Sequence, residues 1–203
     1  MAMKTAKSIL FAFLFVLAGL SPLFAQQSME ARIDKIRLTA EKTPYFSSSS
    51  HSSQNFWLAV NVDFSTKAAN EWINEMDVRF VLLMELENGR FVYMDKTIPY
   101  VDVQNGRQHH VVAYVKPAFF ERYMRSSRPD AGKISVHVEI SAGGRRLAAD
   151  DKYANPKIPK NWFGNLNKLR DMSGELRAKS TTPFAPLDYD YYEEEKPDTK
   201  KGN

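Results

Sequence analysis

The sequence predicts an all-β protein built as an antiparallel β-sandwich, and two patterns carry this prediction. From about residue 31 to about residue 150 apolar and polar residues alternate, as in strands that bury one face. Turn signals such as Asn88-Gly89 and Gly143-Gly144 divide this region into short segments. About 7–8 strands with turns every ~8–12 residues are typical of an immunoglobulin-like sandwich. We expect a short helix and an irregular C-terminal extension beside them.

The expected strands follow one another along the chain. The first spans residues 36–40, and the second spans 56–64 with Phe56, Leu58, Val60, Val62 and Phe64 inward. A third, over 76–86, is joined by a type I′ turn at Asn88-Gly89 to a fourth over 90–96. Separate extended segments follow at 98–103 and 109–115, and then strands at 133–141 and 145–149. Pro117 opens the helix, whose Phe119, Phe120 and Tyr123 cover one end of the sheets.

The N-terminal segment, residues 1–25, is predicted to be a signal peptide. Lys4 and Lys7 precede an apolar run over 9–20, and small Ala25 offers a cleavage site. This run is too short for a membrane span, which needs ~20 residues. The chain contains no cysteine and no Asn-x-Ser/Thr triplet, so disulfides, thiolate metal sites and lipid anchoring at cysteine are excluded. We therefore expect a bacterial exported protein, in the periplasm or at the outer membrane and cell surface.

The rest of the chain divides into three parts. We expect the sandwich over residues 26–151, a basic extension packing on it over 152–181, and an acidic disordered tail over 182–203. Without Lys4 and Lys7 the net charge of +4 falls to +2, which is a poor footprint for a nucleic-acid partner. No transmembrane span is expected in the mature chain.

Candidate catalytic and metal-binding residues lack the arrangement that such chemistry needs. His109 and His110 are neighbours on a predicted strand, so they point to opposite faces and cannot chelate one ion together. The serines around His51 lie in a low-complexity loop over 45–55, and no G-x-S-x-G motif occurs. Asp150-Asp151 ends a strand, while the remaining clustered acids lie in the tail. We predict no catalytic residue, no metal site and no cofactor.

Two groups of aromatic residues remain as candidate contact surfaces. Trp57, with Tyr93 or Tyr100, is a candidate aromatic patch for a sugar or a protein. In the other interpretation, which we favour, the basic extension covers Trp57 through Trp162 and Phe163.

The acidic tail is the second candidate surface. We predict a docking peptide that orders only when bound to a partner, so deleting 182–203 should leave the melting temperature almost unchanged. Its apolar anchors are Phe184, Leu187, Tyr189, Tyr191 and Tyr192.

The stretch KSTTPFAPL at residues 179–187, followed by a Tyr/Asp-rich segment, resembles a small family of exported proteins from Verrucomicrobia such as Akkermansia. The resemblance implies an immunoglobulin-like fold and a gene cluster similar to the type IV pilus assembly locus, with no catalytic motif. Our main hypothesis is a non-enzymatic, exported protein-interaction module of a pilus-like envelope assembly, with other envelope or pilus-type proteins as partners. The alternative is a glycan-binding or host-contacting surface module. A hydrolase whose site the sequence does not reveal is a third hypothesis.

Overall fold

A computed structural model describes residues 29–44, 55–106, 108–152, 158 and 161–197 of the chain. The predicted signal peptide, His51 and nearly all of the Ser-rich loop lie outside the described residues. Among the helices of the described part, none is both long enough and apolar enough to span a membrane.

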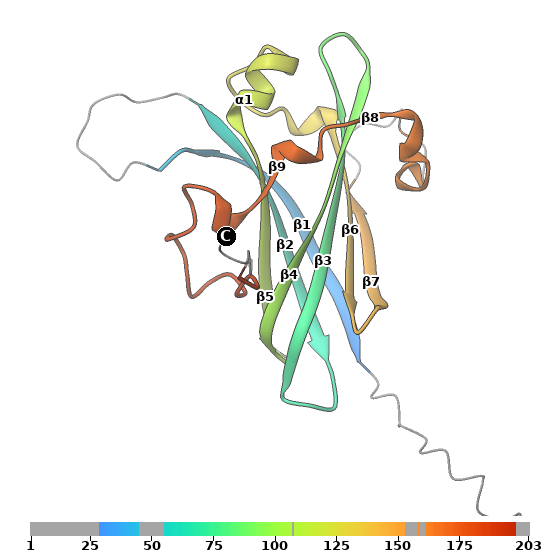
Figure 1. The fold of residues 1–203 in the computed structure, drawn as a ribbon, viewed down its shortest axis with the longest axis vertical. Coiled ribbons are helices and arrows are strands. Elements are labelled where there is room, and N and C mark those ends of the chain that lie inside the picture. Colours follow the sequence, from blue (N-terminus) through green and yellow to red (C-terminus); the bar gives the residue numbers. More distant parts are fainter. Residues whose placement is uncertain (1–28, 45–54, 107, 153–157, 159–160, 198–203) are drawn as a thin grey trace, which may run out of the picture.

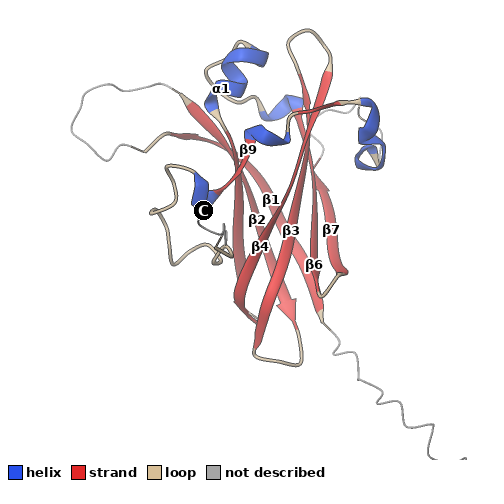
Figure 2. Cartoon of the chain, in the orientation of Figure 1, coloured by secondary structure: helices blue, strands red, loops and turns tan. Residues whose placement is uncertain are grey.

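The described chain folds into two packed β-sheets, which confirms the all-β sandwich (Figures 1 and 2). The first sheet has the order β1-β2-β5-β9, with β1 (Glu30–Lys42), β2 (Phe56–Lys67), β5 (Gln108–Val115) and β9 (Leu176–Ala178). The second has the order β7-β6-β3-β4-β8, with β7 (Arg145–Lys152), β6 (Ile134–Ala142), β3 (Trp72–Glu85), β4 (Phe91–Gln104) and β8 (Arg170–Asp171). Neighbouring strands are antiparallel except β8, which runs parallel to β4.

The alternating residues of the predicted strands meet between the two sheets and form one core. Buried side chains of β2 there contact the inner face of β3 and β6, as the alternation predicts. Phe56 differs, because it lies only half-buried at the start of β2, with the Arg128 guanidinium 5.1 Å from its ring centroid. The predicted inward residues that are fully buried in this core are Leu58, Val60, Val62, Phe64, Val78, Phe80, Leu82, Val136 and Val138.

The two separate segments predicted over 90–96 and 98–103 form one strand, β4. Along most of β4 the even-numbered residues, such as Ile98 and Tyr100, face the core. Near the end of the strand an odd-numbered residue, Val103, faces it. The change follows Asp102, whose φ of 51° lies in the left-handed region and shifts the side-chain alternation by one residue. Local pattern did not predict one continuous strand because Lys96 interrupts the apolar alternation between the two predicted segments.

The turn between β3 and β4 also differs from the prediction. Gly89 has a φ of 74°, but Asn88 does not have the positive φ that a type I′ turn requires. Leu86 N–H donates to Arg90 O at 2.8 Å, and Gly89 N–H donates to Leu86 O at 2.9 Å. These bonds define a three-residue hairpin loop that ends in a left-handed glycine.

Short helical segments cover the sandwich at its end and on one face. The predicted helix consists of α1 (Pro117–Phe119) and the π-helical η1 (Phe120–Met124), and the rings of Phe119 and Phe120 close one end of the core. A 3₁₀ segment, η2 (Ala131–Lys133), precedes β6.

The part of the basic extension around η3 (Trp162–Lys168) packs on the outer face of the second sheet. There η3 contributes Trp162, which packs with Val81 and Leu83 of β3. The Phe163 ring stacks on the ring of His137 with centroids 3.5 Å apart. Beyond β8, the segment η4 (Ser173–Glu175) leads the chain across to β9 on the first sheet (Figure 1).

Candidate functional site

The chain after β9 forms a loop on the outer face of the first sheet, which we call the C-terminal loop (residues 179–195). It begins with η5 (Lys179–Thr181) and is anchored by the ring of Phe184, which is 5% exposed. That ring stacks on Tyr114 with centroids 4.4 Å apart, and it meets Trp57 edge-on at 5.8 Å. The predicted disordered tail is therefore ordered against its own domain through residue 197, because the outer face of β2 and β5 is itself apolar.

The end of the C-terminal loop passes between the open edges of both sheets. Glu193 N–H donates to His110 O of β5 at 2.9 Å. Val101 N–H of β4 donates to Glu194 O at 3.0 Å, and Lys196 N–H donates to Pro99 O at 2.9 Å. The loop thus satisfies backbone groups that two edge strands would otherwise present to other chains.

Side chains clasp the loop at both ends. The Glu195 carboxylate accepts hydrogen bonds from the backbone N–H groups of Lys179 at 2.7 Å and Ser180 at 3.0 Å, so the last residue of the loop is tied to its first. The Tyr192 hydroxyl donates to Asn61 Oδ1 at 3.0 Å, on β2. The two ends of the loop therefore lie close together, and its middle is held on the first sheet.

His109 and His110 point to opposite faces of β5, as predicted, and both contact the C-terminal loop. His109 is 1% exposed, and its Nδ1 lies 2.9 Å from Glu193 Oε1 while its Nε2 lies 3.1 Å from the Thr66 hydroxyl. The Glu193 carboxylate accepts, so Nδ1 of His109 carries a proton and donates it to Oε1. His110 points outward, where Tyr191 stacks on its ring at 4.1 Å.

Burial changes the proton affinity of several groups around the loop. It raises the pKa of Tyr192 to about 12, together with the nearby negative charge of Glu41. It also raises the pKa of Tyr114 well above its ordinary range. Burial lowers the pKa of Lys179, whose Nζ donates to Ala185 O at 3.0 Å and lies 5.4 Å from the Tyr192 ring centroid. These groups are held in their neutral or hydrogen-bonded forms by the folded loop.

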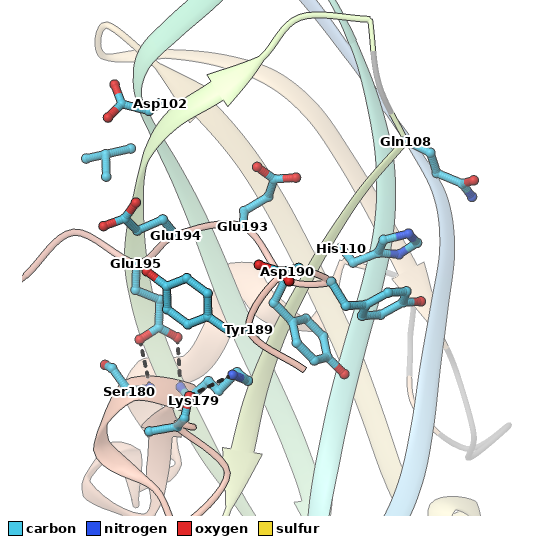
Figure 3. Close-up of a pocket in the computed structure, with 14 residues that line it drawn as sticks. Asp102, Gln108, His110, Lys179, Ser180, Tyr189, Asp190, Glu193, Glu194 and Glu195 are labelled. Atoms are coloured by element: carbon cyan, nitrogen blue, oxygen red, sulfur yellow. Dashed lines mark hydrogen bonds between the residues drawn. The ribbon is translucent and has the colours of Figure 1, made fainter. Parts of the chain in front are cut away.

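A pocket of about 510 Å³ lies between the C-terminal loop and the adjoining ends of β4 and β5 (Figure 3). Its walls carry Asp102, Gln108 and His110 from the strands and Tyr189, Asp190 and Glu194 from the loop. Within the described chain, the carboxylates of Asp102, Asp190 and Glu194 make no hydrogen bond or ion pair, in contrast to those of Glu193 and Glu195. The pocket is therefore negatively charged and lined by aromatic rings.

The residues predicted to dock a partner take two different positions in the loop. Phe184 is buried, and Leu187 and Tyr192 pack against the same cluster, so these three anchor the loop to its own domain. Tyr189 and Tyr191 are 70% and 47% exposed at the pocket. Of the five predicted anchors, these two have side chains that stay exposed at the surface.

The predicted aromatic patch does not form. Tyr100 is 1% exposed and belongs to the core, because its position on β4 faces inward. Tyr93 lies half-buried on the second sheet, whereas Trp57 lies on the first. Trp57 is covered, as we favoured, but by Phe184 of the C-terminal loop rather than by Trp162 and Phe163.

Other polar side chains, beside the site and on the second sheet, pair with one another within the domain. Asp63 accepts hydrogen bonds from Arg37 Nη2 at 3.0 Å and from His110 Nδ1 at 2.9 Å. His137 Nδ1 lies 2.6 Å from Asp151 Oδ1, beneath the ring of Phe163. In the part of the chain that the structure describes, no group of three or more acidic or histidine side chains is placed to hold a metal ion.

Sequence reasoning missed the strand residues of the pocket. Asp102 and Gln108 lie on either side of the Asn105-Gly106 turn signal, and nothing in their local pattern marks them as partners of the loop. An acid that interrupts an alternating strand, as Asp102 does, was the one available signal.

These features define the class as a β-sandwich module whose open edges are closed by its own C-terminal loop. A protein-family model matches residues 23–199, and the chain belongs to that family. Three chains of solved structures match this fold, among them a crystal structure of a protein from Akkermansia muciniphila. That match has a TM-score of 0.71 and 16% identity, and it covers 85% of this chain and 95% of the other. At this identity the likeness shows a shared fold. No curated protein matches the sequence.

Proposed function

We propose that this protein is a non-enzymatic, exported protein-interaction module of a type IV pilus-like envelope assembly. The predicted signal peptide and the resemblance of residues 179–187 to exported proteins of the Akkermansia type support this proposal. The family match over residues 23–199 and the shared fold with a protein from Akkermansia muciniphila agree with that resemblance.

One observation carries the interaction role: the C-terminal loop presents exposed rings after its own backbone and anchors have been satisfied. Tyr189 and Tyr191 are two of only three large apolar side chains exposed in the described chain. Tyrosine is enriched at the centres of protein interfaces because it buries a large ring and keeps a hydroxyl for hydrogen bonding. A loop clasped at both ends presents such rings at a small cost in conformational entropy.

Affinity purification of the mature protein from its native envelope, followed by mass spectrometry, tests the proposal. We expect pilus-type components, such as a secretin or inner-membrane alignment proteins, to be recovered with the wild type. Tyr189→Ala/Tyr191→Ala should lose them, while Trp72→Ala, which removes the third exposed ring from the start of β3, should retain them. Recovery of soluble enzymes alone, from either protein, would contradict the proposal.

A further inference from the structure

We propose that the acidic, tyrosine-lined pocket at the C-terminal loop docks the basic side of a second copy of this chain, so that copies associate head to tail. The inference rests on the proposed function, since it names the partner that this surface takes within an assembly.

The pocket has the chemistry of a receptor for cationic side chains. Asp102, Asp190 and Glu194 line the pocket and are exposed, and among the described residues their carboxylates have no hydrogen-bond or ion-pair partner. Tyr189 and Tyr191 line the same pocket. Carboxylates bind lysine and arginine through charge-assisted hydrogen bonds, and aromatic faces attract the same cations.

The chain's own cation in the pocket does not neutralise these carboxylates. Lys179 Nζ is bound to Ala185 O at 3.0 Å, and burial lowers the pKa of this amine. Glu195 holds the backbone N–H groups of Lys179 and Ser180 rather than the lysine amine. The negative charge of the pocket rim is therefore available to a partner.

The complementary charge belongs to the same protein. Residues 152–179 carry a net charge of +5, and residues 182–203 carry −3. In the structure, Lys168 and Arg170 of the basic extension are exposed at η3 and β8. Figure 1 shows η3 and the C-terminal loop on opposite sides of the sandwich, so Lys168 and Arg170 cannot reach the pocket of their own molecule. They can reach the pocket of a second copy.

The arrangement also determines the geometry of the contact. The acidic pocket and the basic extension are different surfaces, so the contact is heterologous rather than two-fold symmetric. Each copy that uses its pocket leaves its basic side open, and each copy that uses its basic side leaves its pocket open. Such contacts generate rings or open filaments.

Sedimentation velocity over a range of protein concentrations, at ~0.05 M and ~0.5 M salt, tests the proposal on the mature chain. We expect concentration-dependent association at low salt that weakens at high salt. Asp190→Lys and Lys168→Glu should each weaken it at least about tenfold. Combining the two substitutions in one chain should restore it, because each interface then holds a swapped ion pair. Glu121→Lys, an exposed charge reversal on η1, is the matched control and should leave it unchanged.

Several outcomes would overturn the inference. A wild-type protein that stays monomeric at low salt excludes a second copy as the partner, and so does association that Asp190→Lys leaves intact. Binding of a lysine-rich peptide without self-association would assign the pocket to a basic segment of another protein. Binding of neutral oligosaccharides that Asp190→Lys does not weaken would assign it to a glycan. Recovery of envelope components by a monomeric protein would keep the proposed function while removing this inference.

Discussion

At the scale of single residues, Phe184 does most to attach the C-terminal loop. Its apolar ring is 5% exposed and packs between the rings of Tyr114 and Trp57. We expect Phe184→Ala to lower the free energy of unfolding by about 3–5 kcal/mol, because it removes buried surface and leaves a cavity. Urea denaturation measures this, with Tyr189→Ala as the control. An equal effect of both substitutions would mean that the loop is not attached as described.

Leu82 tests the core between the sheets in the same way. Its side chain is fully buried on the inner face of β3, opposite the inner face of the first sheet. Leu82→Ala should cost about 2–5 kcal/mol in the free energy of unfolding. The exposed Thr97→Ala on neighbouring β4 should stay within about 0.5 kcal/mol. Equal midpoints for the two variants in urea would contradict the sandwich core.

Tyr192 makes the stability of the protein depend on alkaline pH. Burial raises its pKa to about 12, above the ordinary value of ~10. A raised pKa means that the neutral phenol stabilises the fold fully below about pH 10, and that this contribution is lost as the pH rises through about 12. We expect the unfolding free energy to fall over this window, with a shallower slope in Tyr192→Phe. Tyr189→Phe, at an exposed ring, should keep the wild-type slope in denaturant titrations at each pH.

At the scale of elements, the clasp at Glu195 holds the two ends of the C-terminal loop together. Glu195→Ala leaves the backbone N–H groups of Lys179 and Ser180 without their acceptor. We expect faster hydrogen exchange at these two amides and at Val101, with the exchange of β3 and β6 unchanged. Glu194→Ala, which removes an exposed carboxylate from the preceding residue, is the control. Unchanged exchange at Lys179 would show that the clasp does not hold the loop.

The strands show how far local pattern determines this fold. The inner faces of β2, β3 and β6 were predictable because alternation marks residues that one sheet buries against another. The outer face of β2 was not, because Ala59 and Trp57 are covered by Phe184, more than a hundred residues further on. For the same reason the local sequence of the loop predicts a disordered acidic tail. Its apolar residues are too few to pack with one another, and they are buried instead against strands that are distant in the sequence.

At the scale of the whole molecule, the C-terminal loop covers exposed edge strands of both sheets. One chain end pairs with β5 through Glu193 and with β4 through Glu194 and Lys196, at the edges of two different sheets. The core cluster between the sheets includes neither these residues nor Phe184. The loop is therefore a cover on a domain whose main core is complete without it.

Deletion of residues 182–203 tests whether the loop only covers the sandwich or also belongs to its core. An unattached tail would leave the melting temperature almost unchanged, as the sequence predicts, but Phe184 and Tyr192 are anchored on β5 and β2. We now expect the sandwich to stay folded but to melt roughly 6–15 °C lower, since the apolar outer face of the first sheet becomes exposed. The freed edges of β4 and β5 should also make the truncated protein aggregate on heating. Circular dichroism melting and light scattering measure both effects. A melting temperature equal to that of the full mature chain would mean that the loop contributes no stability, and complete loss of the sheet signal would mean that it belongs to the core.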